Sequence, residues 1–424
     1  MSDRGAAPFG LYERTLAGRY LRAKRKHGGV AMISIISFIA IMLAVAVLII
    51  TMSVMNGFRE VLLSRILGVN GHVYVDTVGQ TPDVVERIAR IAREIPGVTH
   101  VSPLIDDQAL AVAGGVSSGV FVRGIRQEDL RALTMVSDTL RQGGSLDRFM
   151  GVEAPEIVIG DRLAARLGVG EGQAISILSS QGAATPFGLS PRQKAFVVGG
   201  VFSVGMTEYD LGLIYMPLEQ AQILFNRGDG VDRLELRLQN PDATLPIMLE
   251  LRQKLPPDVT IFDWRRQNEG LVGALVVERN VMRLILMMIV AIAALNIVTG
   301  LIMLVKNKSR DIAILRTVGA TKGSIMRIFF MASATIGVLG LLSGVILGVA
   351  FCTYIGPIQD FVQAVTGFDL FPGSVYSLET LPARVEYSEV ALIAIFTIVV
   401  TFASTLLTAW WGSRLDPVEA LRYE

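Results

Sequence analysis

The hydrophobic residues of this chain are concentrated in long runs that carry no charged residue. These runs are Val30–Met55, Leu284–Val305, Ile328–Gln359 and Val390–Ser413. About 20 consecutive apolar residues are enough for a helix that crosses a bilayer, so each run predicts one transmembrane helix. The predicted helices occupy residues 28–55, 280–305, 328–358 (the third with an extension) and 389–413. The first run exceeds the ~7–15 apolar residues of a cleavable signal peptide, so we expect it to stay as an anchor.

Between the first and second runs, residues 56–279 show the shorter periods of a folded α/β domain. Arg233–Leu238 alternates apolar and polar residues, which is typical of a half-buried strand, and Pro82–Ile95 has the helical spacing of an amphipathic helix. Other expected strands are His72–Asp76, Val98–Ile105, Asp107–Val112, Val120–Arg123 (after a glycine-rich turn, Gly114–Gly119) and Glu156–Gly160. We therefore expect a large mixed α/β domain inserted between the first and second helices.

One segment of this domain, around residues 181–195, does not fit a tight hairpin. It separates two expected strands, Ala174–Leu178 and Phe196–Val201, and contains Pro186 and Pro191. Hairpin loops usually have two to five residues, so the sequence predicts a long, stiff loop here. A solvent-exposed turn and a docking arm are both compatible with it.

Lys and Arg are segregated, and this predicts the orientation of the chain. Near the predicted helices, Lys and Arg are concentrated within residues 1–27, 306–327 and 414–424. The loop at 359–388 carries only Arg384 among basic residues. The positive-inside rule therefore predicts a cytoplasmic N-terminal segment, a cytoplasmic coupling segment (306–327) and a cytoplasmic tail. Residues 56–279 and 359–388 face outward. The formal net charge is +1, and we expect no nucleic-acid partner.

The sequence does not carry the pattern of an enzyme. Its three histidines are not spaced with Cys, Asp or Glu as a metal site requires. The closest approach to a phosphate-binding loop, Gly319–Ser324, has its lysine before the second glycine and cannot cradle phosphates in the usual way. The single cysteine, Cys352, excludes an intrachain disulfide. We expect no catalytic residue, no bound metal and no cofactor in this chain, so energy for any transport has to come from a partner.

The segment Ser309–Phe330 is the candidate for that partner contact. Ile312, Leu315, Val318 and Ile325 form an apolar stripe, and Arg310, Arg316, Lys322 and Arg327 are basic. Gly319-Ala320-Thr321 separates two short helical stretches. The alternative is an interfacial helix that lies on anionic lipid.

Three stretches resemble known permeases. Asn307–Gly340, with the run DIAILRTVGA, and the tail DPVEALRYE are similar to the cytoplasmic parts of type VII ABC-transporter permeases, the MacB and FtsX group. Within Arg22–Val73, the strings SVMNGF, ILG and GHV resemble the lipoprotein-releasing permeases LolC and LolE. The order of one span, a large outer domain and three spans agrees over essentially the whole chain.

The resemblance implies a multi-pass protein of the bacterial inner membrane with a periplasmic α/β domain and a non-catalytic role. It implies these partners: two copies of a LolD-type ATPase that binds ATP and Mg²⁺, a second permease subunit (an unlike LolC/LolE paralogue or another copy of this chain), a lipoprotein substrate and a LolA-type periplasmic carrier. The expected activity is mechanical extraction of lipoproteins from the outer leaflet. The alternatives are a MacB-like efflux permease, an FtsX-like signalling permease and a membrane-anchored enzyme or sensor whose outer domain binds a small ligand.

The resemblance also assigns candidate residues. The coupling residues would be Arg310, Asp311, Ile312, Leu315, Arg316, Gly319, Ala320, Thr321, Lys322 and Ile325. The carrier-binding hook would consist of Thr185, Pro186, Phe187, Gly188, Leu189, Pro191, Arg192, Gln193 and Lys194. Flexible apolar residues near the outer end of the first helix are candidates for lipoprotein contact: Val47, Met52, Met55 and Phe58. Such residues also suit ordinary lipid or helix contacts.

The third hydrophobic run contains a repeated small-residue motif. Gly340, Gly344 and Gly348 recur at four-residue intervals, which places them on one face of a helix. Such motifs allow two helix backbones to approach closely. The spacing predicts close packing, either within the chain or between two chains.

Overall fold

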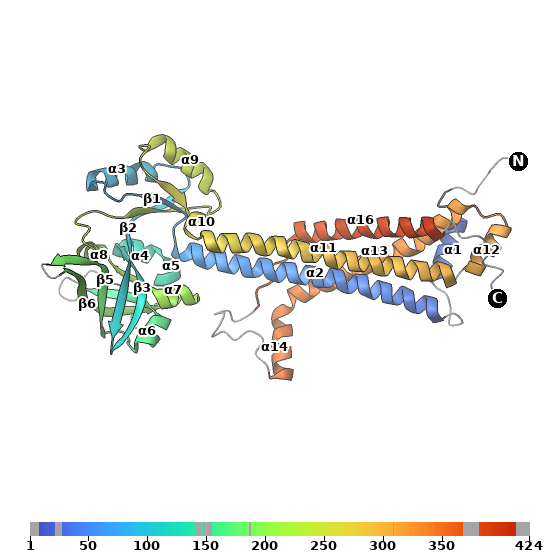
Figure 1. The fold of residues 1–424 in the computed structure, drawn as a ribbon, viewed down its shortest axis with the longest axis horizontal. Coiled ribbons are helices and arrows are strands. Elements are labelled where there is room, and N and C mark those ends of the chain that lie inside the picture. Colours follow the sequence, from blue (N-terminus) through green and yellow to red (C-terminus); the bar gives the residue numbers. More distant parts are fainter. Residues whose placement is uncertain are drawn as a thin grey trace. The chain divides into compact units, whose positions relative to one another are not determined.

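The computed structural model describes residues 8–21, 28–140, 146, 149, 155–185, 188–307, 309–367 and 381–412. The described chain divides into two compact units (Figure 1). The helical unit consists of residues 8–60, 274–367 and 381–412, and the α/β unit consists of residues 61–273.

Long apolar helices make up the helical unit. Its elements are α1 (Leu11–Leu21), the first part of α2 (Gly28–Val69), most of α11 (Glu269–Asn307), α12 (Ser309–Thr317), α13 (Lys322–Thr353), α14 (Ile355–Thr366) and α16 (Tyr387–Gly412). Among the described residues, 3 helical segments are long and apolar enough to span a membrane, namely Ile35–Val69, Lys322–Thr353 and Tyr387–Leu407. The fourth predicted span, residues 280–305, lies inside α11 and stays a prediction as a membrane span. The predicted extension of the third span is a separate helix, α14.

The glycine motif of α13 packs against α2 of the same chain. A Cβ added to Gly344 would lie 2.7 Å from the carbonyl oxygen of Met42 and 2.8 Å from Cβ of Val45. A Cβ added to Gly340 would lie 3.0 Å from Cβ of Ile41, and one added to Gly348 would lie 3.0 Å from Cβ of Ile49. Figure 1 also shows α16 alongside α13. The motif therefore serves packing within the chain, which the sequence left open.

The strands of the α/β unit form a barrel and a smaller sheet, and the two share strand β2. The strands are β1 (Val73–Asp76), β2 (Val98–Ala113), β3 (Val116–Ile125), β4 (Glu156–Gly160), β5 (Ala174–Thr185), β6 (Gly188–Phe202), β7 (Leu213–Pro217), β8 (Arg233–Leu238) and β9 (Ile261–Asp263). Their order is β3-β7-β4-β6-β5-β2-β8-β1-β9, and β3 also pairs with β2. Strands β3 to β2 thus form a closed barrel, and β2 continues into a second sheet with β8, β1 and β9.

Short helices cover this sheet. They are α3 (Pro82–Arg93), α4 (Gln127–Ala132), α5 (Thr134–Ser137), α6 (Asp161–Leu167), α7 (Thr207–Gly212), α8 (Leu218–Leu224), α9 (Thr244–Lys254) and α10 (Trp264–Gln267). The helical spacing predicted for α3 is confirmed, because Val85 and Ile88 are buried in the main hydrophobic core. The mixed α/β character of the domain is also as predicted.

The prediction of two strands at Val98–Ile105 and Asp107–Val112 is wrong, because both belong to the single strand β2. The two adjacent acids do not interrupt it, since Asp106 lies 3.6 Å from Arg123 and Asp107 lies 3.0 Å from Arg227. Strand β3 also begins earlier than predicted. Its hairpin with β2 turns at Gly114 and Gly115 alone, with φ of 56° and 83°, as a two-residue turn with positive φ requires.

The prediction of a long loop at residues 181–195 is wrong as well. Residues 181–185 and 188–195 extend β5 and β6, which pair through Gly182–Pro191 and Ala184–Leu189 out to Thr185–Gly188. An irregularity between Leu178 and Gly182 shifts the register. Proline lacks an N–H donor, but one strand of a two-stranded arm has a free edge that tolerates it. The prolines therefore did not indicate a loop.

Candidate functional sites

The first candidate site is the arm, defined here as residues 181–195 of the β5–β6 hairpin. Beyond Gly182 and Pro191 these strands pair only with each other among the described residues, because β2 pairs with β5 at 176–179 and β4 pairs with β6 from Val197 onward. The outer half of the arm is thus a two-stranded extension of the barrel. Predicted hook residues Pro186 and Phe187, and the side chains of Thr185 and Leu189, lie outside the described part of the structure.

The base of the arm is fixed to the neighbouring helix α8. Arg192 Nη1 donates to the carbonyl oxygen of Ile223 at 3.3 Å, and Lys194 Nζ donates to Gln220 Oε1 at 2.5 Å. The Lys194 ammonium also lies 5.7 Å from the ring centre of Phe196. Two cations predicted to contact a carrier therefore hold the arm in place, and Pro191 and Gln193 are exposed beside them.

The second candidate site is the coupling segment, which forms α12, a tight turn and the start of α13. Gly319 has φ of 110°, and the Ala320 amide donates to the carbonyl of Leu315 at 2.9 Å, which closes the end of α12. Thr321 caps α13, because its hydroxyl accepts a hydrogen bond from the Ser324 amide at 3.2 Å. The predicted break between two helices is confirmed.

The structure corrects which apolar residues of this segment can meet a partner. Ile312 and Ile325 are buried in a cluster with Phe329 and Ala409, so they stabilise the unit itself. The exposed apolar side chains are Ile314, 52% exposed, and Val318, 83% exposed. The sequence predicts an apolar stripe on the helix, but it does not show which residues of that stripe α16 of the same chain covers.

The remaining predicted coupling residues border the turn. Lys322 is exposed beside Thr321, and Leu315 and Arg316 are half-buried. The side chains of Arg310 and Asp311 lie outside the described residues.

A buried ion pair fixes α1 to the first turn of α13. Glu13 is fully buried, and its carboxylate accepts hydrogen bonds from Ser324 Oγ at 2.7 Å and from Arg327 Nη2 at 2.7 Å. Hydrogen bonds from the Arg327 guanidinium and the Ser324 hydroxyl lower the pKa of Glu13 below its usual value, although burial acts in the opposite direction. From the sequence, Arg327 was expected only to be a basic residue of the coupling segment. Glu13 lies more than 300 positions away in the chain, so no local pattern could have paired them.

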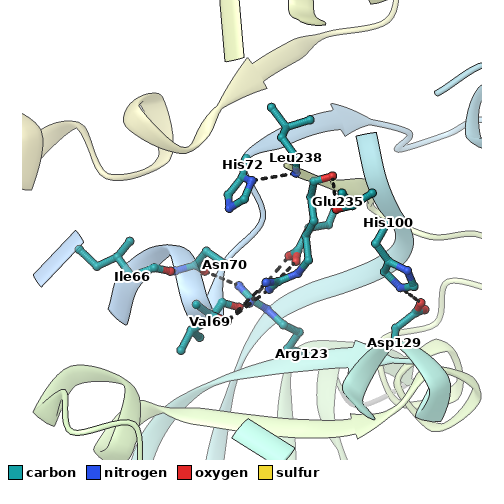
Figure 2. Close-up of polar contacts among 12 residues, drawn as sticks. Ile66, Val69, Asn70, His72, His100, Arg123, Asp129, Glu235 and Leu238 are labelled. Carbon is teal, nitrogen blue, oxygen red and sulfur yellow. Dashed lines mark hydrogen bonds and ion pairs between the residues drawn. The ribbon is translucent and has the colours of Figure 1, made fainter. Parts of the chain in front are cut away.

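A second buried polar cluster lies at the C-terminal end of α2 within the α/β unit (Figure 2). The Arg123 side chain from β3 donates to the carbonyl oxygen of Val69 and to Asn70 Oδ1, each at 3.1 Å. Its guanidinium lies 3.6 Å from Asp106 and 4.0 Å from Glu235. A cation at the end of a helix interacts favourably with the last carbonyls and with the helix dipole. Arg123 thus holds the end of α2 against the strands of both sheets.

Two histidines beside this cluster have opposite electrostatic environments (Figure 2). Burial, aided by the charge of Arg237, lowers the pKa of His72 from 6.5 to about 4, and its Nδ1 accepts a hydrogen bond from the Leu238 amide at 2.8 Å. The hydrogen bond with Asp129, at 2.6 Å, raises the pKa of His100. No group of three or more potential metal ligands occurs in the part of the chain that the structure describes.

Comparison with known proteins decides the family. A MacB-like periplasmic core domain matches residues 34–254, and an FtsX-like permease C-terminal domain matches residues 283–417. The lipoprotein-releasing system transmembrane protein LolC of Xylella fastidiosa is 35% identical over 96% of this chain and 97% of its own length. The chain belongs to the LolC/LolE family.

Other LolC/LolE family members agree over similar lengths. LolC of Neisseria meningitidis is 33% identical and LolE of Haemophilus influenzae is 27% identical, each over 96% of this chain and 98% of the relative. Among solved structures, the periplasmic region of MacB from Actinobacillus actinomycetemcomitans covers 50% of this chain and 97% of its own, at 14% identity and a TM-score of 0.32. Membership thus rests on sequence over nearly the full chain.

The residues predicted for lipoprotein contact in this LolC/LolE family chain do not share one environment. Val47 is exposed, whereas Met52 packs against the buried cluster that includes Ile41 and Val45. Met55 and Phe58 are half-buried. Val47 is thus the one of the four with a largely free side chain, and a role in lipoprotein contact stays a prediction for all of them.

Proposed function

We propose that this chain is the membrane subunit of an ATP-driven complex that extracts lipoproteins from the outer leaflet of the inner membrane and passes them to a LolA-type periplasmic carrier. Identity over nearly the full length to lipoprotein-releasing system transmembrane proteins carries this proposal. The division into a helical unit and a separate α/β unit supports it, because one unit has apolar helices for the membrane and the other has a soluble core.

Energy for extraction would come from a separate LolD-type ATPase, which binds ATP and Mg²⁺. Ile314 and Val318 on the coupling segment form a small exposed apolar surface, with the cation of Lys322 beside it. Such a surface fits a groove on a partner whose rim carries acids. Closure of two ATPases would move two coupling segments together and transmit the movement through the helices that follow.

The need for an external energy source follows from the cargo. Each buried CH₂ of an acyl chain contributes roughly 0.8 kcal/mol to membrane affinity, so a lipoprotein with several chains does not leave the bilayer spontaneously at a useful rate. The complex would need a second permease subunit, either an unlike LolC/LolE paralogue or another copy of this chain. Mass determination of the purified complex distinguishes a homodimer from a heterodimer.

The arm would be the docking element for the carrier. Its base is held by α8, so its two strands keep their direction before the carrier arrives, which lowers the ordering cost of binding. A two-stranded arm also has free strand edges to which an extended segment of a partner can hydrogen bond.

The test uses proteoliposomes that contain the full chain with its co-purified subunits and a radiolabelled lipoprotein. We expect lipoprotein to appear with the soluble carrier only when ATP and the carrier are both present. ATP-dependent export of a small molecule without lipoprotein release would favour the MacB-like efflux alternative and contradict the proposal.

An arm-shortened variant tests the docking step in the same assay. The pairing of Gly182 with Pro191 allows residues 183–190 to be replaced by Asn-Gly, a two-residue hairpin turn. We expect at least about tenfold less transfer to the carrier, with ATP hydrolysis retained. The matched control changes the β2–β3 turn at Gly115 to Asn. Normal transfer by the shortened variant would exclude the arm as the docking element.

A further inference from the structure

An apolar groove of about 540 Å³ lies between α1 and α13 in the helical unit. Its walls include Ala17 and Gly18 from α1, and Phe330, Ala334 and Val338 from α13. Arg14 is the one charged residue in its lining. We propose that this groove binds one acyl chain of an anionic phospholipid and that Arg14 binds the headgroup phosphate. This site is distinct from lipoprotein extraction and does not depend on it.

The position of Arg14 is set by its neighbour in the chain. Glu13 is buried and bonded to Ser324 and Arg327, which fixes this turn of α1 against the first turns of α13. One turn later, Ala17 packs against Ile328 and Ala332. The wall of the groove is therefore held by an ion pair and a small apolar cluster, and it does not depend on a bound lipid to form.

The length of the groove fits a lipid chain in one leaflet. Its α13 wall runs from Phe330 to Leu339, about 13 Å at 1.5 Å per helical residue. Half of a ~30 Å hydrocarbon core is about 15 Å. The wall begins close to Arg327, near the N-terminal end of a membrane-spanning segment, so a chain in the groove belongs to the leaflet on the side of the N-terminus.

Charge selects the headgroup. Arg14 is exposed, and none of the ion pairs among the described residues uses its guanidinium, whereas the neighbouring Glu13 is fully occupied by Arg327. Arginine binds phosphate oxygens with two parallel hydrogen bonds. The sequence after α1 adds further positive charge from Arg22 and the segment 24–26. An anionic phospholipid therefore fits better than a zwitterionic one or an apolar protein helix.

Native mass spectrometry of the full chain tests the proposal. The detergent-purified, delipidated protein is mixed with micelles that contain phosphatidylglycerol or phosphatidylcholine with identical acyl chains. We expect phosphatidylglycerol to be retained preferentially and Arg14→Gln to weaken its retention about fivefold, the factor that matches about 1 kcal/mol for one basic residue near a membrane surface. Arg19→Gln is the control, because Arg19 lies on the same helix but outside the groove lining.

A second variant blocks the groove without removing charge. No atom lies within 4 Å of a Cβ added to Gly18, so Gly18→Leu is compatible with the fold, and leucine favours a helix more than glycine does. We expect Gly18→Leu to reduce lipid retention, and Thr15→Leu, an exposed position on α1 outside the groove lining, to leave it unchanged. Retention of phosphatidylglycerol by Arg14→Gln and by Gly18→Leu that equals retention by the unsubstituted chain would overturn the proposal. So would a photo-crosslinker at Thr335 that labels protein instead of lipid.

Discussion

At the scale of single residues, the two units depend on buried charges that pair with distant partners. Arg123 joins the end of α2 to strands β2 and β8, and Glu13 joins α1 to α13. Removing one partner of a buried ion pair leaves the other charge buried and uncompensated, which is much more costly than losing an exposed pair. Residues of this kind were not identifiable as structural anchors from the sequence.

Arg123→Ala is expected to lower the free energy of unfolding of the α/β unit by about 3–5 kcal/mol, because Asp106 and Glu235 lose their common cation. Chemical denaturation of the full chain in detergent measures the loss. Arg126→Ala is the control, since Arg126 is exposed and lies 3.9 Å from the exposed Glu128, so its change should stay within about 0.5 kcal/mol. Similar losses in both variants would show that the cluster at the end of α2 is not an anchor.

His72 is expected to make the α/β unit less stable as the pH falls from 6.5 toward 4. Its pKa in the folded chain is about 4, so between these values the unfolded state binds a proton that the folded state does not. Denaturation midpoints at several pH values measure the slope. His72→Asn keeps an acceptor for the Leu238 amide and should flatten the slope in this window. His100 acts in the opposite sense, because its raised pKa stabilises the folded state at low pH and this contribution is lost as the pH rises. An unchanged slope in His72→Asn would contradict the assignment.

At the scale of elements, close backbone contact decides how the helical unit packs. The glycines of α13 leave room for α2 at Ile41, Val45 and Ile49. In the α/β unit, the pairing register of β5 with β6 shifts between Leu178 and Gly182, where the arm begins. The sequence predicted the elements involved in both cases. The predicted conformation of the arm was wrong, because proline, which is typical of turns and loops, is also tolerated on edge strands.

Gly344→Ala is expected to destabilise the helical unit by about 1–3 kcal/mol, because the new methyl group would overlap the Met42 carbonyl oxygen and Val45. Thermal unfolding of the full chain in detergent measures the effect. Gly356→Ala in α14 is the matched control. No atom lies within 4 Å of its added Cβ, so it should be neutral or slightly stabilising. A neutral Gly344→Ala would mean that α2 and α13 do not pack as closely as described.

At the scale of the whole molecule, the proposed contact with an ATPase needs exposed side chains on the coupling segment. The exposed side chains of the coupling segment, Ile314 and Val318, are the candidates, and the buried ones, Ile312 and Ile325, are internal supports. Substitutions of the exposed residues should affect partner binding, and substitutions of the buried residues should affect stability. An alanine scan of the whole segment would not separate these two effects.

The double variant Ile314→Ser/Val318→Ser is expected to reduce co-purification of the ATPase at least about tenfold, with little change in thermal stability, because it removes exposed apolar contacts only. Quantitative pull-down from cells that express the full complex measures the association. Ile312→Ala should instead cost about 2–5 kcal/mol of stability, as it leaves a cavity beside Phe329. Undiminished ATPase association in the double variant would locate the coupling surface elsewhere.

The sequence by itself determined the membrane character, the inserted α/β domain, the break at Gly319 and the family. Long uncharged runs, short alternating strands and local motifs produce these features, and each can be recognised from residues that lie close together in the chain. Tertiary structure alone decided the closed barrel, the two-stranded arm, the packing of Gly344 against α2 and the pairing of Glu13 with Arg327. These depend on which surfaces meet in space, and burial at a given position is set by residues that are remote in the chain.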